Sequence, residues 1–179
     1  KVIYGCELTL VDDSVSIVKR SNDSVLLDNT YVVFDFETTG FNAAGGDSII
    51  EIGAVKLFNG EIIDKFDKLI NPGHLISERI TKVTNITNEM LKDCPNEEEA
   101  VREFLEWAGD LPMVAHNAKF DTSFLEMAYR KYNLGEYTNP VIDTLPLSRV
   151  LDQDAARHGL SAITKRYGVP FDEESHHRG

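Results

Sequence analysis

The sequence predicts an α/β fold in which a mixed sheet carries helices on its faces. A short apolar strand opens the main part of the chain at Tyr31–Phe36. Two longer β-rich runs follow, joined by Asn59 and Gly60, and beyond Asn96 helical patterns alternate with short apolar strands. Because Asn-Gly is the strongest short hairpin signal, the second and third strands are expected to be antiparallel.

The strands are predicted from apolar runs that are bounded by turn residues. They cover Tyr31–Phe36, Ile49–Phe58, Glu61–Ile70, Pro112–Ala115 and Pro140–Asp143. The turn signal Asn71-Pro72-Gly73 ends the third run. The prediction is therefore a mixed five-stranded sheet, with a meander of three strands followed by two strands reached through α/β crossovers.

The helices are predicted from caps and from apolar residues that recur at helical spacing. Asn96 resembles an N-cap because Glu99 follows three residues later, as in a capping box. Phe120, Phe124 and Ala128 share one helical face. The predicted helices are Ser77–Val83, Thr87–Lys92, one from Asn96 to Trp107, one beginning near Ala118 or Lys119, Leu145–Leu151 and Leu160–Tyr167.

Length and composition indicate one globular domain with a short appendage. The 179 residues are 42% hydrophobic, which suits a single core. Residues 1–29 are too short to bury a core of their own, so we interpret them as a flanking segment and residues 30–179 as the domain. No apolar run approaches the roughly 18 residues of a membrane span. Cys6 and Cys94 are isolated, so we expect reduced thiols in a cytoplasmic protein with no membrane partner.

The net charge of −12 limits the partners that the chain can hold. Proteins that grip long duplex DNA by its phosphates are usually basic. Independent tight binding of duplex DNA is therefore not expected. A nuclease remains possible, because carboxylates in a site can hold metal ions that meet the phosphate. Such an enzyme would hold only a few nucleotides locally.

Asp35 and Glu37 stand at the end of the first strand. Residues two apart leave the same face of a strand, so their carboxylates could share one or two divalent cations such as Mg²⁺ or Mn²⁺. An isolated pair of this kind is more often solvated surface, and the buried strand before it favours metal binding. Thr38, Thr39 and Gly40 follow. Gly40 permits a tight turn, and the small residues allow the backbone to approach a ligand.

Two further clusters lie later in the chain. In HNAKFD, His116 ends a strand and Asp121 falls in the first turn of the next helix, at the sheet edge where α/β folds bind ligands. The helix dipole alone could also explain Asp121, and Asn117 could cap the helix. The second cluster, SHHRG, closes the sequence. Its histidines suit either a surface stretch or a general base.

Taken in order, DFETTG, HNAKFD and HHR resemble the DnaQ-like exonucleases of the DEDDh type over about residues 30–179. Within that family, YVVFDFETTG, NGEIIDKF, FLEW, VAHNAKFD, NPVIDTL and HHR are similar to the proofreading exonuclease domain of PolC-type bacterial DNA polymerase III α subunits. KVIYGCELTLVDD resembles the sequence of a polymerase-and-histidinol-phosphatase (PHP) domain just before such an insertion. Glu7 would then match a metal-site position of that domain, separated here from its companions.

The resemblance implies a ribonuclease H-like fold and a metal-dependent 3′–5′ exonuclease. Such an enzyme removes nucleoside monophosphates from single-stranded 3′ ends of DNA and proofreads within a replicative polymerase. Its cofactors would be two Mg²⁺ or Mn²⁺ ions. Asp35 would bind both ions, Glu37 one, Asp121 would join the acidic cluster, and His177 would be the general base. The implied substrate-binding residues are Thr38, Thr39, Gly40, Phe41 (as a wedge between bases), His116 and Asn117.

The sequence departs from the family pattern at its end. The family places a final metal-binding Asp five residues after the histidine that matches His177, beyond Gly179. We therefore expect a C-terminal helix and its carboxylate to lie outside the given sequence. Two alternatives stay open. One is an RNA-trimming DEDDh nuclease, similar to RNase T or oligoribonuclease, although the PHP-like segment favours replication. The other is a catalytically incomplete binding module.

Overall fold

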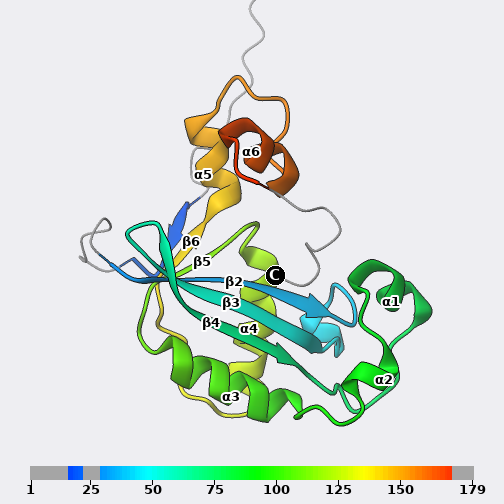
Figure 1. The fold of residues 1–179 in the computed structure, drawn as a ribbon. Helices are drawn as coiled ribbons and strands as arrows, with labels where there is room; N and C mark the ends of the chain where they lie inside the picture. The colour runs from blue at the N-terminus through cyan, green and yellow to red at the C-terminus, as the bar shows by residue number, and fades with distance from the viewer. Residues whose placement is uncertain (1–15, 22–28, 171–179) are drawn as a thin grey trace, which may run out of the picture.

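The computed structural model describes residues 16–21 and 29–170, which a single mixed sheet organises (Figure 1). Its strand order is β1-β6-β5-β2-β3-β4. The strands are β1 (Val18–Lys19), β2 (Tyr31–Thr38), β3 (Ile49–Phe58), β4 (Glu61–Leu69), β5 (Met113–Ala115) and β6 (Val141–Asp143). The five predicted strands are all present.

The sixth strand corrects the predicted strand number. β1 comes from the flanking segment and pairs antiparallel with β6, through Val18↔Ile142 and Lys19↔Val141. A two-residue strand carries no periodicity of its own, so only its pairing with the sheet edge identifies it.

The connections within the sheet follow the prediction. β2 pairs antiparallel with β3, and β3 with β4, while β2–β5 and β5–β6 are parallel. Phe58 pairs with Glu61 around the predicted hairpin turn. Asn59 and Gly60 both have positive φ, 50° and 81°, as a two-residue hairpin of this type requires.

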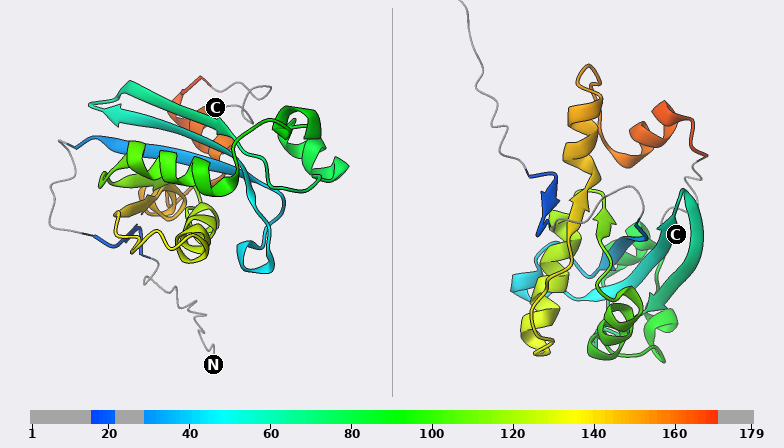
Figure 2. Two further views of the ribbon diagram at one scale, coloured as in Figure 1. Left: turned by 90° about the horizontal axis from the view of Figure 1, so that it is seen from below. Right: turned by 90° about the vertical axis from the view of Figure 1, so that its left-hand side faces the viewer.

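Helices lie on both sides of the sheet. In Figures 1 and 2, α3 and α4 cover one face, α5 and α6 stand on the opposite side, and α1 and α2 lie beyond one end. The helices are η2 (Ala43–Gly45), α1 (Glu78–Thr84), α2 (Asn88–Leu91), α3 (Glu97–Ala108), α4 (Lys119–Lys131), α5 (Thr144–Leu151) and α6 (Leu160–Tyr167). Among the residues described, no helix has the length and apolar character needed to cross a bilayer.

The observed boundaries stay within one or two residues of the predicted ones. The capping box of Asn96 and Glu99 at the start of α3 is confirmed. β2 extends two residues beyond its predicted end, because Glu37 and Thr38 still pair with β3, with a register shift between them. Asp35 and Glu37 therefore lie inside the strand, where sheet pairing holds their backbone.

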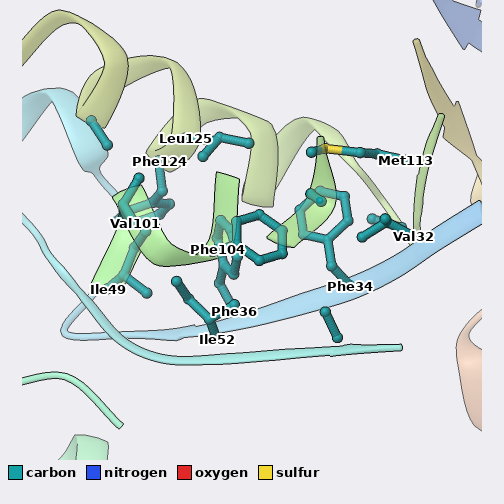
Figure 3. Packing of buried hydrophobic residues seen from close by; sticks show 14 of the residues in the cluster. Val32, Phe34, Phe36, Ile49, Ile52, Val101, Phe104, Met113, Phe124 and Leu125 are labelled. Carbon is teal, nitrogen blue, oxygen red and sulfur yellow. The ribbon is translucent and has the colours of Figure 1, made fainter. Parts of the chain in front are cut away.

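A cluster of aromatic rings lies within the core between the sheet and α3 (Figure 3). Phe104 is fully buried. Its ring centroid lies 6.1, 5.9 and 5.6 Å from those of Phe34, Phe36 and Phe66, and 6.3 Å from Trp107. Since Phe34 and Phe36 belong to β2, this cluster fixes the position and orientation of the strand that carries Asp35 and Glu37.

We expect Phe104→Ala to lower the free energy of unfolding by about 3–5 kcal/mol, because it removes the ring at the centre of this cluster and leaves a cavity. Urea denaturation followed by circular dichroism measures the change. Phe58→Ala is the matched control, since Phe58 is 39% exposed, and it should cost less than about 1 kcal/mol. Equal losses in the two variants would contradict the central role of Phe104.

Candidate active site

Asp35 and Glu37 project from the face of β2 that is turned away from the aromatic core. Burial alternates along the strand, so Phe34 and Phe36 are each 3% exposed, whereas Asp35 is exposed and Glu37 half-buried. The expectation that the two carboxylates share one face is confirmed. The strand can therefore keep an apolar face in the core without burying either charge.

Asp121 is the most deeply buried of the three predicted carboxylates, with 1% of its surface exposed. It lies in the first turn of α4, and its Oδ1 accepts a hydrogen bond of 3.0 Å from the backbone N–H of Phe36. The N–H of Val32, four residues earlier on β2, donates to Pro112 O at 2.9 Å. Alternate N–H groups of a strand point the same way, so Phe36 N–H also faces β5.

β5 ends at Ala115 and offers Phe36 no further carbonyl. Asp121 supplies the missing acceptor and continues the ladder with a side chain. Its carboxylate is thereby tied to the backbone between Asp35 and Glu37. The helix-dipole explanation accounts for a first-turn carboxylate but not for this burial or this specific partner.

Burial, and after it the negative charges of Asp35 and Glu37, raise the pKa of Asp121 to about 8, against the lowering effect of hydrogen bonds from backbone N–H groups, among them that of Phe36. The three carboxylates are thus close enough to repel one another. Such a cluster favours either a proton or a cation in its midst.

The chemistry of these donors fits a divalent metal. Carboxylate oxygens are the hard ligands that Mg²⁺ and Mn²⁺ prefer, and a cation would relieve the repulsion that raises the pKa of Asp121. Within residues 16–21 and 29–170, however, no group of three His, Cys, Asp or Glu side chains is arranged closely enough to hold an ion by itself. His177 and Glu7 both lie outside the described residues.

The chain bends directly after β2, as predicted, and the structure adds a second reason for glycine at position 40. Gly40 is not among the residues with positive φ. Instead, a Cβ at this position would meet Asp47 Oδ2 at 2.3 Å, so only glycine leaves room for that carboxylate. Thr38 is buried and its hydroxyl donates to Gly40 O at 2.6 Å. Thr39 pairs with Ser48 through its backbone N–H and its side-chain oxygen, both at 2.9 Å.

Phe41 forms an apolar edge beside the carboxylates. It is 82% exposed, and its ring centroid lies 6.1 Å from that of Phe120, the residue before Asp121. Phe120 in turn packs on Phe124 with the centroids 5.2 Å apart. An exposed aromatic side chain supported in this way offers a surface on which a base can stack.

His116 lies directly after β5 and is half-buried, with Nδ1 3.0 Å from Thr144 Oγ. Burial lowers its pKa, and the charges of Asp143 and Asp35 oppose that shift. His116 is therefore within electrostatic reach of Asp35. Its ring also interacts with the backbone of His158, so this histidine connects β5 to α5 and to the segment before α6.

The predicted capping role of Asn117 is wrong. The N-cap of α4 is Ala118, which makes no side-chain hydrogen bond, and Asn117 has a positive φ of 60°. Asparagine tolerates this left-handed conformation. The backbone of Asn117 makes the contacts of the turn: its N–H donates to Asp143 Oδ1 at 3.0 Å, and its carbonyl accepts from Phe120 N at 3.0 Å.

Sequence reasoning did not single out Asp143, Thr144 or Asp47. Asp143 Oδ1 accepts from both Asn117 N and Leu145 N at 3.0 Å, and Thr144 Oγ lies against His116. The sheet-edge argument used for His116 applies equally to the end of β6 and could have found both. The only feature of the sequence that relates to Asp47 is Gly40, seven positions earlier, and it does not identify Asp47 as its partner.

The predicted residues of the described part gather at one end of the sheet. Asp35, Glu37 and the segment Thr38–Phe41 come from the carboxyl end of β2, and His116, Asn117 and Asp121 from the carboxyl end of β5 and the start of α4. They form an acidic centre with an exposed aromatic residue on one side and the half-buried His116 near Asp35.

Comparisons with known proteins agree with this arrangement. An exonuclease family model, RNase T, matches residues 32–179. The chain is 51% identical over 178 residues to the PolC-type DNA polymerase III of Staphylococcus aureus, covering 99% of the chain and 12% of that protein. The chain thus spans about an eighth of the length of this relative.

Solved structures share the fold. Exonuclease X in complex with 5′ overhanging duplex DNA matches with a TM-score of 0.62 and 25% identity over 79% of this chain and 75% of that one. Exonuclease I of E. coli in complex with a dT13 oligonucleotide matches with a TM-score of 0.66 and 17% identity over 80% and 37% of the chains. The second likeness shows the fold alone.

Exonucleases of this family generally depend on divalent metal ions, which agrees with a carboxylate cluster whose mutual repulsion a cation would relieve. On the family match over residues 32–179 and the neighbouring folds, the chain belongs to the exonuclease family, in the DnaQ-like DEDDh group that its motifs resemble.

Proposed function

We propose that this chain is the 3′–5′ exonuclease domain of a PolC-type replicative DNA polymerase in the cytoplasm. It removes nucleoside monophosphates from single-stranded 3′ ends of DNA and thereby proofreads. The observation that carries the proposal is the hydrogen bond from Phe36 N–H to Asp121, which ties a buried third carboxylate to the backbone between Asp35 and Glu37. The 51% identity to a PolC-type polymerase supports the setting in replication.

Asp35, Glu37 and Asp121 would hold two divalent cations, Mg²⁺ or Mn²⁺. When bound, such ions supply an activated water nucleophile and stabilise the phosphoryl group and the leaving 3′ oxygen. The described residues contribute three of the family's acidic positions. The position expected beyond Gly179 would complete the site.

The protein's own residues bind and orient the substrate around this centre. The acidic cluster repels a phosphodiester, so it selects against nucleic acid unless cations are present. The hydrogen bond from Phe36 N–H prevents the Asp121 carboxylate from turning away. Thr38, Thr39, Gly40 and Phe41 receive the terminal nucleotide, and His116 and Asn117 line the neighbouring edge. His177 takes the proton from the attacking water.

DNA is favoured over RNA as the substrate by the relatives. Almost the whole chain is similar to part of a DNA polymerase, and exonuclease X was solved with DNA. The net charge of −12 argues that affinity for long DNA comes from the rest of a larger polypeptide. This domain then needs to hold only the last few nucleotides.

Asp35→Ala should lower turnover at least about 100-fold while leaving the fold intact. Residues that merely orient metal ligands are already worth about 10- to 100-fold, and Asp35 is exposed on a strand whose other face forms the core. The assay is the stepwise shortening of 5′-labelled single-stranded DNA with Mg²⁺ or Mn²⁺, on the domain carrying its expected C-terminal helix.

Asp110→Ala is the matched control, because Asp110 is an exposed carboxylate just before β5, at the opposite end of the parallel strands. Near-normal turnover by Asp35→Ala would refute the catalytic assignment. No release by the wild-type domain with either metal would refute the exonuclease itself. Faster cleavage of a matched RNA 3′ end would establish the RNA-trimming alternative.

Asp121→Asn should change how stability depends on pH in the absence of metal. The pKa of Asp121 rises from 3.8 to about 8 on folding, so between these values the folded state keeps a proton that the unfolded state has lost. The stability that this group contributes is complete below about pH 4 and falls as pH rises toward about 8. Asparagine cannot ionise and lacks this dependence.

The difference in Tm between Asp121→Asn and the wild type should therefore grow from about pH 5 to about pH 8 in EDTA and then level off. Thermal unfolding at unit pH steps measures it. Adding Mn²⁺ at the highest pH should stabilise the wild type more than the variant. Two parallel curves would show that Asp121 does not carry the raised pKa.

A further inference from the structure

The segment Thr39–Ser48 connects β2 to β3 and carries three of the residues proposed to receive the terminal nucleotide, Thr39, Gly40 and Phe41. We call it the 39–48 loop. Its shape decides where the exposed ring of Phe41 stands relative to Glu37, which lies two residues before the loop on β2.

One carboxylate in the loop, that of Asp47, joins its two ends. Asp47 Oδ2 accepts from the backbone N–H of Asn42 at 2.9 Å, and Asp47 Oδ1 accepts from the hydroxyl of Thr39 at 3.4 Å. The N–H of Asp47 donates to Asn42 O at 3.2 Å. Asp47 therefore contacts the residues on both sides of Gly40 and Phe41.

The loop backbone wraps closely around this carboxylate. A Cβ on Gly40 would lie 2.3 Å from Oδ2, 2.5 Å from Cγ and 2.6 Å from Oδ1 of Asp47. The carboxylate thus fills the space that a side chain of residue 40 would need. The carboxylate of Asp47 can occupy this position only because residue 40 is a glycine.

Packing and hydrogen bonds together hold the loop beside α4. Ala43 belongs to the buried core, and a pocket of about 160 Å³ between the loop and α4 is lined on the loop side by Ala43, Ala44, Gly46 and Asp47. The outer part of the loop, where Phe41 lies, is held by the hydrogen bonds of Asp47 and by the contact of Phe41 with Phe120.

We propose that Asp47 is a positioning residue for the 3′-terminal nucleoside. It holds Thr39 and Phe41 in one geometry, so that the Phe41 ring, supported by Phe120, presents a preformed surface to the terminal base. The inference rests on the proposed function, because it names the part of the substrate that this loop receives. Asp47 acts through Thr39 and Phe41 and touches no reacting atom.

The direction in which KM for DNA changes distinguishes a positioning role of Asp47 from a purely electrostatic one. Asp47 is negative and lies near the path of a polyanion, so loss of its charge alone would strengthen DNA binding. Loss of its hydrogen bonds would loosen the loop and weaken binding. Asp47→Asn removes the charge and replaces one carboxylate oxygen with an NH2 group in a side chain of nearly the same shape. Asp47→Ala removes both the charge and the hydrogen-bonding atoms.

The test measures KM and kcat for a single-stranded DNA with 2-aminopurine at its 3′ terminus, in the domain with its expected C-terminal helix. Asp47→Ala should raise KM about tenfold, as expected for the loss of two hydrogen bonds, with kcat changed less than about threefold. Asp47→Asn should restore KM to within about threefold of the wild type. Asp110→Ala, which removes an equal charge at the far end of the sheet, should leave both constants unchanged.

Two measurements do not need turnover. Quenching of 2-aminopurine fluorescence, with Ca²⁺ in place of Mg²⁺, should be weaker in Asp47→Ala because the base stacks less regularly. Hydrogen exchange should accelerate at the amide of Asn42, whose acceptor is lost. Gly40→Ala should raise KM like Asp47→Ala. The double variant should raise KM by less than the two single effects combined, since the new methyl group enters the space vacated by the carboxylate.

An unchanged KM in Asp47→Ala, or unchanged exchange at Asn42, would overturn the positioning role while the wild-type domain remained an active exonuclease. A lower KM in Asp47→Ala would assign the residue to simple charge repulsion. A wild-type domain that neither quenches the probe nor releases nucleotides would overturn the proposed function itself and the nucleoside assignment with it. These outcomes are distinguishable within one set of variants.

Discussion

The site depends on one hydrogen bond at the place where a strand runs out. β5 stops at Ala115, before a further carbonyl can pair with Phe36, and Asp121 at the start of α4 accepts from the Phe36 N–H instead. A buried carboxylate is costly unless its oxygens are satisfied, and this bond partly meets that cost. It also couples helix to strand, since any shift of α4 along the sheet would break it. The positions of Asp35, Glu37 and Asp121 are thus set together by the ladder of β2.

The same arrangement places three mutually repelling carboxylates, those of Asp35, Glu37 and Asp121, at the centre of the site. Burial and the proximity of Asp35 and Glu37 raise the pKa of Asp121, which means that the cluster is unfavourable when all three groups are ionised and no cation is present. The aromatic core on the other face of β2 offsets this unfavourable repulsion, because Phe104 packs on both Phe34 and Phe36 and stabilises the strand. The two faces of β2 therefore have different roles. The face with Phe34 and Phe36 stabilises the fold, and the face with Asp35 and Glu37 carries negative charges that a metal ion can neutralise when it binds a phosphodiester.

Local rules predicted most of the elements, and they failed where a partner distant in the sequence decides the conformation. The Asn59-Gly60 hairpin and the Asn96 capping box rest on neighbours within a few residues and were confirmed. Asn117 was expected to cap α4 because its side chain is suitable, yet its backbone is held by Asp143, 26 residues away. Gly40 lies in the expected bend, but only the structure shows that its lack of a side chain accommodates Asp47. β1 was assigned to the flanking segment, because only its pairing with β6 makes it part of the sheet.

The sequence by itself determined the fold class, the order of strands and helices, the shared face of Asp35 and Glu37, and the motifs that resemble DEDDh exonucleases. These features follow from short-range periodicity, caps and turn residues, and from motif order along the chain. Only the tertiary structure decided that Asp121 is the buried member of the cluster, that Phe36 N–H is its partner, and that Asp47 shapes the loop beside it. Burial, electrostatic repulsion and hydrogen bonding between distant residues depend on distances in space, and those distances exist only after the sheet and its helices have packed.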